Sequence, residues 1–263
     1  MLGSIIGDIV GSVYEFNNYR AKDFEPLFHK NAFFTDDTVC TIAVADALVN
    51  ECDPAVALRN WGRCYWSNGG WGQRFAIWIA TDDMGPYGSF GNGAAMRVAP
   101  AGLLARSLDE AIEFSNRVTR VTHNHPEGMR GAAATAVAVH LAHFDISAAE
   151  IRKEIACRFG YDMTPSVDEI RPHYVHNERS QDTVPQALTC ALEAINFEDA
   201  IRNAISIGGD SDTIAAIAGG VAEALFGIPD DISARAWSYL PSEMRAILRL
   251  LYAATECRRR KTT

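Results

Sequence analysis

Apolar stretches of helical length run along most of the chain, separated by short polar or glycine-rich segments. None shows the strict alternation of apolar and polar residues that is typical of a half-buried strand. Because no proline-, serine- or glycine-rich linker interrupts the pattern, we expect an all-α fold in one domain over residues 1–263, whose N- and C-terminal thirds meet at the core. The expected helices cover residues 2–16, 39–48, 54–65, 94–98, 107–121, 127–144, 147–159, 184–195, 197–207, 212–220, 229–240 and 241–258, with a short one ending near residue 80.

The segment from Gly208 to Gly220 organises this pattern. Two glycines form a turn, Asp210, Ser211 and Asp212 follow, and the helix after them is almost entirely Ala, Ile and Val. A helix that is apolar on all sides is typical of a protein core, so its acidic start is expected at the edge of that core. A carboxylate that leaves water needs a partner or a cation.

A second helix start repeats this chemistry. The mostly apolar run 39–48 follows the polar residues Thr35, Asp36, Asp37 and Thr38. One interpretation is that Asp210 is an ordinary N-terminal cap and that the helix dipole favours Asp212. In the other, the two starts meet, and their four carboxylates repel one another unless a cation lies between them. All-oxygen ligands suit Mg²⁺, Ca²⁺ or Mn²⁺ rather than zinc.

The first predicted helix carries glycines at every fourth position. Gly3, Gly7 and Gly11 leave a smooth groove that another helix can approach closely. Asp8 and Glu15 are seven residues apart, which places them on one face of this helix. They are either solvated surface acids or part of a functional site, and the neighbouring glycines favour the functional site.

A glycine-rich segment is a further candidate site. Residues 81–92 read as a long loop, and long loops in compact domains are often functional. Gly91, Asn92 and Gly93 then open a predicted helix, where free backbone N–H groups suit a phosphate. Most glycine-rich turns are only turns, but Arg97 strengthens the phosphate interpretation modestly.

Histidines and cysteines give little sign of a zinc site. His123 and His125 lack a third nitrogen or sulfur ligand, so we expect them to cap, to form hydrogen bonds or to line a pocket. The six cysteines are scattered and form no CxxC pair, which leaves no zinc-ribbon or redox motif. A reducing cytoplasm is the simplest setting for such a chain.

Composition limits the possible partners. The 263 residues are 48% hydrophobic and 22% charged, as in ordinary globular proteins. The formal net charge of -9 argues against a broad nucleic-acid surface, although a small anionic ligand stays possible. The first residues lack a basic region and a long apolar run, so we expect no signal peptide and no membrane span.

Five motifs, in order along most of the chain, resemble the ADP-ribosylglycohydrolase family. They are Gly7-Asp8 with Glu15, Thr35-Asp36-Asp37-Thr38, Gly91-Asn92-Gly93 with Met96-Arg97, His123-Asn124-His125-Pro126 and Gly209-Asp210-Ser211-Asp212-Thr213. The resemblance implies an all-α domain with a centre of two Mg²⁺ or Mn²⁺ ions at helix N-termini. By the same resemblance the metal ligands are Thr35, Asp36, Asp37, Asp210, Asp212 and Thr213, and the residues that contact ADP-ribose are Gly91, Asn92, Gly93 and His123.

The resemblance also implies a metal-dependent hydrolase that removes ADP-ribose from a modified acceptor, with arginine on protein as the expected acceptor. Our hypothesis is that Asp36 or Glu15 orients or deprotonates the attacking water, and Glu15 matches a family residue that can gate the substrate. Asp82 or Asp83 is a weaker candidate for ribose or leaving-group chemistry. Acceptor specificity is expected in residues 65–92 and 171–182.

Two other functions stay open at this stage. One is hydrolysis of a serine-, nucleic-acid- or O-acetyl-linked ADP-ribose conjugate, and the other is ADP-ribose binding without catalysis. The expected partner is an ADP-ribosylated protein or another ADP-ribose conjugate, with no membrane and no general nucleic-acid binding. We expect a cytoplasmic monomer.

Overall fold

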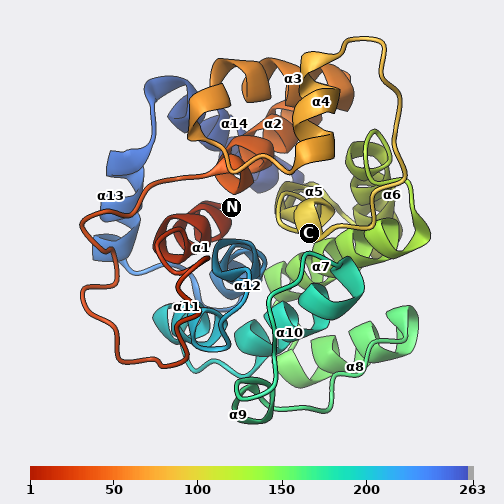
Figure 1. Cartoon of the computed structure of the whole chain (residues 1–263). Coiled ribbons are helices and arrows are strands. Elements are labelled where there is room, and N and C mark those ends of the chain that lie inside the picture. Colours follow the sequence, from red (N-terminus) through yellow and green to blue (C-terminus); the bar gives the residue numbers. More distant parts are fainter. Residues whose placement is uncertain (260–263) are drawn as a thin grey trace.

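Helices α1 (Leu2–Gly11) and α12 (Ser211–Phe226) lie side by side at the centre of the computed structural model, which describes residues 1–259 (Figure 1). Helices α7 (Pro126–His143), α10 (Ser180–Leu192) and α11 (Phe197–Ser206) also pack against α12. Residues 211–222 of α12 are buried, as expected for a helix that is apolar on all sides. The N- and C-terminal thirds of the chain therefore meet at the core, as predicted.

Glycines bring α1 and α12 into backbone contact. A Cβ atom added to Gly3 would lie 2.2 Å from the carbonyl oxygen of Gly219, and one added to Gly7 would lie 2.0 Å from that of Ala215. No real side chain fits at such distances, so the groove predicted from the glycine spacing is filled by the backbone of α12.

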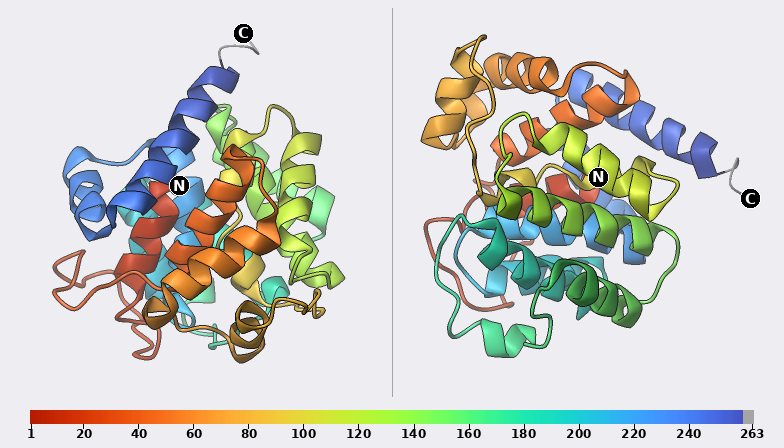
Figure 2. Two further views of the ribbon diagram at one scale, coloured as in Figure 1. Left: turned by 90° about the horizontal axis from the view of Figure 1, so that it is seen from above. Right: turned by 90° about the vertical axis from the view of Figure 1, so that its right-hand side faces the viewer.

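Two groups of helices lie on opposite sides of this central pair (Figures 1 and 2). On one side are α2 (Asp36–Val49), α3 (Pro54–Cys64), the 3-10 helix η1 (Trp66–Asn68), α4 (Gln73–Ala80) and α14 (Ser242–Arg259). On the other are α7 (Pro126–His143), α8 (Ala148–Phe159), α9 (Val167–Ile170) and α10 (Ser180–Leu192). The chain is completed by the 3-10 helix η2 (Asn92–Ala94), α5 (Ala99–Leu104), α6 (Leu108–Thr119), α11 (Phe197–Ser206) and α13 (Asp230–Tyr239).

The all-α prediction is confirmed. Residues 1–259 contain no strand, and their β-type pairing is limited to an isolated bridge between Gly91 and Arg179. Residues 260–263, which the predicted domain includes, lie outside the described part of the chain.

The first helix is shorter than predicted. It ends at Gly11, where the hydroxyl of Ser12 donates to the carbonyl of Ile9 at 2.9 Å and accepts from the backbone N–H of Phe33 at 3.2 Å. Glu15 lies in the turns that follow the helix. The prediction that Asp8 and Glu15 share one helical face is therefore wrong, because the helix ends before it reaches Glu15.

Other elements also differ from the prediction. The expected helix over residues 94–98 is absent, and the 3-10 helix η2 and a turn occupy this region. Pro100 lies in the first turn of α5, where backbone N–H groups have no partner within the helix, so the proline costs no hydrogen bond there. Helix α10 begins at Ser180 rather than at residue 184.

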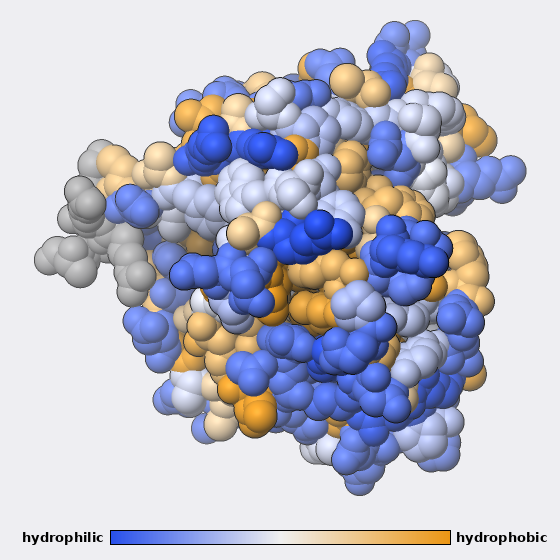
Figure 3. Space-filling view, turned by 90° about the vertical axis from the view of Figure 1, so that its left-hand side faces the viewer, coloured by the Kyte–Doolittle hydropathy of each residue, from blue (hydrophilic) through white to orange (hydrophobic). Residues whose placement is uncertain are grey.

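No helix in the described residues combines the length and the apolarity needed to cross a bilayer. On the side of α13 and the α1–α2 loop, hydrophilic side chains cover most of the surface and hydrophobic residues form small patches between them (Figure 3). This agrees with amphipathic outer helices around an apolar centre.

Candidate active site

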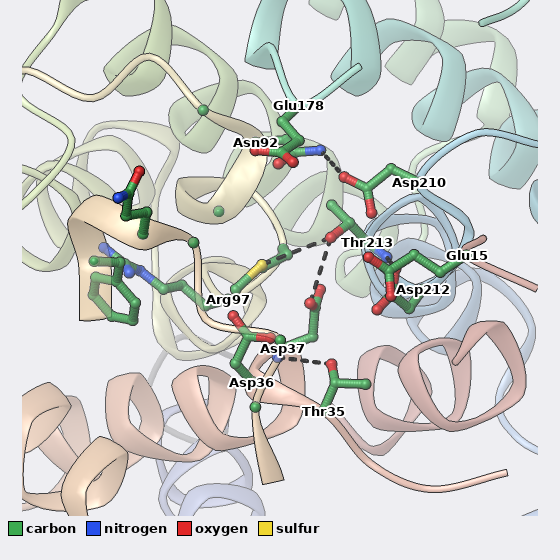
Figure 4. A pocket seen from close by; sticks show the side chains of 18 of the residues that line it. Glu15, Thr35, Asp36, Asp37, Asn92, Arg97, Glu178, Asp210, Asp212 and Thr213 are labelled. Atoms are coloured by element: carbon green, nitrogen blue, oxygen red, sulfur yellow. Dashed lines mark hydrogen bonds between the residues drawn. The ribbon is translucent and has the colours of Figure 1, made fainter. Parts of the chain in front are cut away.

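A cavity of about 580 Å³ opens at the N-terminal ends of α2 and α12 (Figure 4). Its walls come from segments far apart in the sequence, namely the turn after α1, the loop between η1 and α4, residues 87–97, His123 and Glu178. The two polar helix starts meet here, as one interpretation of the sequence predicts. The hydroxyl of Thr213 lies 3.4 Å from Oδ2 of Asp37.

Asp8 holds the start of α2 in place. Thr35 is the N-cap of this helix, and its hydroxyl accepts from the N–H of Asp37 at 3.2 Å. The Asp8 carboxylate accepts from the N–H of Thr35 at 2.9 Å, from its hydroxyl at 2.8 Å, and from the N–H of Thr38 at 3.0 Å. Because Asp8 is fully buried in α1, these bonds tie the helix start to the core.

The start of α12 turns on two glycines. Gly208 and Gly209 have φ values of 71° and 78°, a left-handed conformation that glycine adopts readily. Asp210 follows as the N-cap residue, but its side chain makes no capping hydrogen bond. Instead its Oδ2 accepts from the side-chain amide of Asn92 at 2.6 Å. The interpretation of Asp210 as an ordinary side-chain cap is therefore wrong.

Two overlapping groups of carboxylates result. One oxygen from each of Asp8, Asp37 and Asp212 lies within 4.8 Å of the others, and the same holds for Glu15, Asp210 and Asp212. Asp212 belongs to both groups. Oδ1 of Asp37 is buried and has no hydrogen-bond partner in the described residues.

The electrostatics of these groups favour a cation. Burial and the neighbouring carboxylates Asp8 and Asp36 raise the pKa of Asp37 well above its usual range. Burial and Asp37 do the same to the pKa of Asp212. Burial, with Asp210 as the next cause, raises the pKa of Glu15 to about 7. The ionised cluster is thus destabilised by the protein alone, and a bound cation would remove this penalty.

The donor set fits hard divalent ions. All the candidate ligand atoms are oxygens, from carboxylates and from the hydroxyls of Thr35 and Thr213, and no His or Cys side chain belongs to the groups found in the described residues. The unpartnered Oδ1 of Asp37 is an acceptor that such an ion would satisfy. Mg²⁺ and Mn²⁺ prefer oxygen ligands of this kind.

Other predicted residues divide between the cavity and the surface. Gly91, Asn92, Gly93 and His123 all line the cavity. Asn92 reaches the start of α12 through its hydrogen bond to Asp210. His125 lies outside it and caps α7, where its ring accepts from the N–H of Glu127.

Asp82 and Asp83 do not line the cavity. Asp82 is exposed and pairs with Arg63 at 2.6 Å. The structure therefore gives neither aspartate a place in ribose or leaving-group chemistry.

Sequence reasoning missed Glu178 and the capping role of Asp8. Glu178 lines the cavity, and its carbonyl accepts from the N–H of Asn92 at 2.8 Å, which places the 171–179 segment beside the glycine-rich turn. The polar character of that segment was a signal for its location, but no local pattern marks one acid within it. The four hydrogen bonds of Asp8 reach Thr35 and Thr38 across the fold, so no spacing within one helix predicts them.

Comparisons with known proteins point to one family. The sequence model described as ADP-ribosylglycohydrolase matches residues 1–260. The "ADP-ribosylarginine hydrolase Tri1" of Pseudomonas putida (strain GB-1) is 28% identical over 284 residues, which cover 90% of this chain and 73% of that protein.

A second relative and a solved structure agree with this match. The "ADP-ribosylhydrolase ARH3" of Danio rerio is 25% identical, over 87% of this chain and 82% of that protein. A solved structure titled "ADP-ribosylglycohydrolase-related protein complex" has a TM-score of 0.73 and 22% identity, and covers 97% of this chain and 95% of its own. That likeness supports the fold alone.

Proposed function

Since the chain belongs to the ADP-ribosylglycohydrolase family, we propose that it releases ADP-ribose from ADP-ribosylated arginine on protein with the help of bound divalent ions. The chain is a hydrolase of a glycosidic bond to ADP-ribose, as its family and its named hydrolase relatives indicate. The arginine acceptor and the metal are our additions to this assignment.

The buried carboxylate cluster carries the proposal of a metal. Asp212 belongs to both groups of acids. Oδ1 of Asp37 is buried and has no hydrogen-bond partner in the described residues. We assign two ions, Mg²⁺ or Mn²⁺, one to each group, since each ion would offset two of the negative charges gathered there. The proposed ligands from these groups are Asp37, Asp210 and Asp212. Thr35, Asp36 and Thr213, which belong to neither group but line the same cavity, complete the proposed set.

Ions bound here would hold the two vicinal hydroxyls of the ribose next to the bond that is cleaved, and would lower the pKa of a bound water. The protein's own groups would direct the rest of the reaction. Glu15 or Asp36, both lining the cavity, would orient a water toward the anomeric carbon and accept its proton. The water oxygen bonds to that carbon while the bond to the acceptor nitrogen breaks and the proton passes to the leaving group. The surrounding carboxylates would stabilise the positive charge that develops on the ribose.

Charge complementarity supports arginine as the acceptor. A guanidinium group is a cation, and Glu15 and Glu178 add carboxylates to the wall of the same cavity. Carboxylates are the groups that bind guanidinium in the strongest, two-bonded geometry. The Pseudomonas putida relative is named an ADP-ribosylarginine hydrolase, which favours the same acceptor.

Release of ADP-ribose from a panel of substrates tests the proposal. Arginine-, serine-, nucleic-acid- and O-acetyl-linked conjugates are each incubated with the protein and Mg²⁺ or Mn²⁺, and then with a chelator. We expect the fastest release from the arginine conjugate, and we expect the chelator to stop it. Equal or faster release from another conjugate would refute the arginine assignment, and release that the chelator leaves unchanged would refute the metal. Tight binding of ADP-ribose with no release from any conjugate would indicate a binding protein instead.

A further inference from the structure

Three buried side chains form a hydrogen-bonded series behind one wall of the cavity. Nη2 of Arg97 donates to the hydroxyl of Thr122 at 2.6 Å, and that hydroxyl lies 2.8 Å from Nδ1 of His123. Arg97 and His123 line the cavity, while Thr122 lies behind them and is fully buried. The side chains of Arg97 and His123 are 1% and 5% exposed, so each is held by its protein neighbours.

The donors and acceptors of this series have one consistent order. A guanidinium can only donate, so Thr122 accepts from Arg97. The hydroxyl has one hydrogen of its own, and its two partners in the described part of the chain are Arg97 and His123. If Nδ1 carried a proton, the hydroxyl hydrogen would be buried without an acceptor, at a cost of about 1–3 kcal/mol. The hydroxyl therefore donates to Nδ1, and the proton of the neutral ring is on Nε2.

We propose that Arg97 and Thr122 act as positioning residues that fix His123 in the Nε2–H tautomer and so present this N–H to an anionic oxygen of the ligand. We assign this oxygen to a phosphate of ADP-ribose, and this part of the proposal rests on the proposed function. The tautomer itself does not depend on that function.

The surroundings of His123 support a neutral ring. Burial, and after it the charge of Arg97, hold the pKa of His123 well below its usual range. The ring is then a hydrogen-bond donor through Nε2 without being a cation. An imidazole whose tautomer is set by the bond at its other nitrogen is a general device for fixing where a histidine donates.

The glycine-rich turn leaves the Nε2 edge of the ring open. A Cβ atom added to Gly93 would lie 3.4 Å from Nε2, and one added to Gly91 would lie 3.6 Å away. Side chains at these positions would occupy the space beside the N–H. The two glycines thus keep room for a ligand atom next to the donor.

Nitrogen NMR on protein labelled with ¹⁵N-histidine tests the tautomer directly. Long-range ¹H–¹⁵N correlation distinguishes a protonated from an unprotonated ring nitrogen, and the spectrum of His123→Gln assigns the signals. In the unsubstituted protein at neutral pH we expect a protonated Nε2 and an unprotonated Nδ1. A proton on Nδ1, or on both nitrogens, would overturn the proposal without any reference to activity.

Two substitutions of Thr122 test its role. Thr122→Val removes the hydroxyl and keeps the size of the side chain, so we expect the neutral His123 ring to populate both tautomers. Binding of free ADP-ribose should weaken about tenfold, because one aligned hydrogen bond is lost. Thr122→Ser keeps the hydroxyl and should restore both. A Thr122→Val protein with the original spectrum and affinity would contradict the proposal. If the tautomer is as expected but no conjugate is hydrolysed, the proposed function fails and this arrangement stands.

Discussion

The side-chain amide of Asn92 donates to Oδ2 of Asp210 at 2.6 Å and joins two segments that are 118 positions apart. Both residues are buried, and Asn92 also reaches the hydroxyl of Thr183 on α10 at 3.3 Å. Asn92 lies in the glycine-rich turn, and its hydrogen bond orients the Asp210 carboxylate at the start of α12. Asn92 therefore connects the wall proposed for ADP-ribose with the proposed metal ligands.

Replacement of Asn92 by alanine should weaken metal binding. Partners that orient a ligand carboxylate are worth about 10–100-fold in metal affinity, and we expect a loss in that range for Mn²⁺. Calorimetric titration of the metal-free protein measures it. Asn68→Ala is the matched control, because Asn68 also lines the cavity, whereas the side-chain hydrogen bond to Asp210 in the described residues comes from Asn92. Unchanged affinity in Asn92→Ala would show that Asp210 needs no such support.

Replacement of Asp212 by asparagine should abolish metal binding and turnover and leave the fold intact. Asp212 belongs to both carboxylate groups, so its charge is needed for any ion held there. Metal at 100 times its Kd would add about 2.7 kcal/mol to the stability of the original protein, a rise of several degrees in Tm that the variant should lack.

Without metal, Asp212→Asn should be more stable than the original protein, since it removes the burial of a charge and the repulsion from Asp37, which together raise the pKa of Asp212. Thermal unfolding with Mn²⁺ and with chelator tests both statements. Asp231→Asn, an exposed change on α13, serves as control. An undiminished Mn²⁺ response in Asp212→Asn would remove this residue from the ligand set.

In the presence of a chelator, stability should fall as the pH rises from about 4 to about 7. Burial, followed by the charge of Asp8, raises the pKa of Asp36 from 3.8 to about 7, so the native state keeps a proton that the unfolded state has already lost. The stabilisation is complete below the unfolded pKa and is lost as the pH passes the folded one. Tm measured over this range should decline less in Asp36→Asn than in the original protein. Asp83→Asn, on the exposed loop, should follow the original protein, and identical slopes for all three would contradict the assignment.

Gly7→Ala should destabilise the protein by about 1–3 kcal/mol or more, because a methyl group there forces α1 and α12 apart. Its Cβ would lie 2.0 Å from the carbonyl oxygen of Ala215, a backbone atom that cannot rotate away. Denaturant unfolding gives the change in free energy. Gly85→Ala is the control, since nothing lies within 4 Å of a Cβ at that position. Equal stability of the two variants would mean that the helices can separate freely.

The sequence by itself determined the all-α architecture, the buried central helix and the two polar helix starts. These features are local, because apolar spacing and turn residues act within a few positions of one another. The glycine spacing in α1 likewise marked a close helix contact before its partner, α12, was known. The motifs were specific enough to indicate the family, and the matched sequence model confirms it.

Only the tertiary structure decided how the candidate site is assembled. Glu15 lies beyond the end of α1 and lines the cavity. Asp8 lies in α1 and accepts hydrogen bonds from the start of α2, while Asp82 lies on the surface. These outcomes depend on contacts between segments far apart in the chain, and a local pattern carries no information about them. The packing of α1 against α12 fixes where the two helix starts meet, and that meeting turns separate aspartates into one charged cluster.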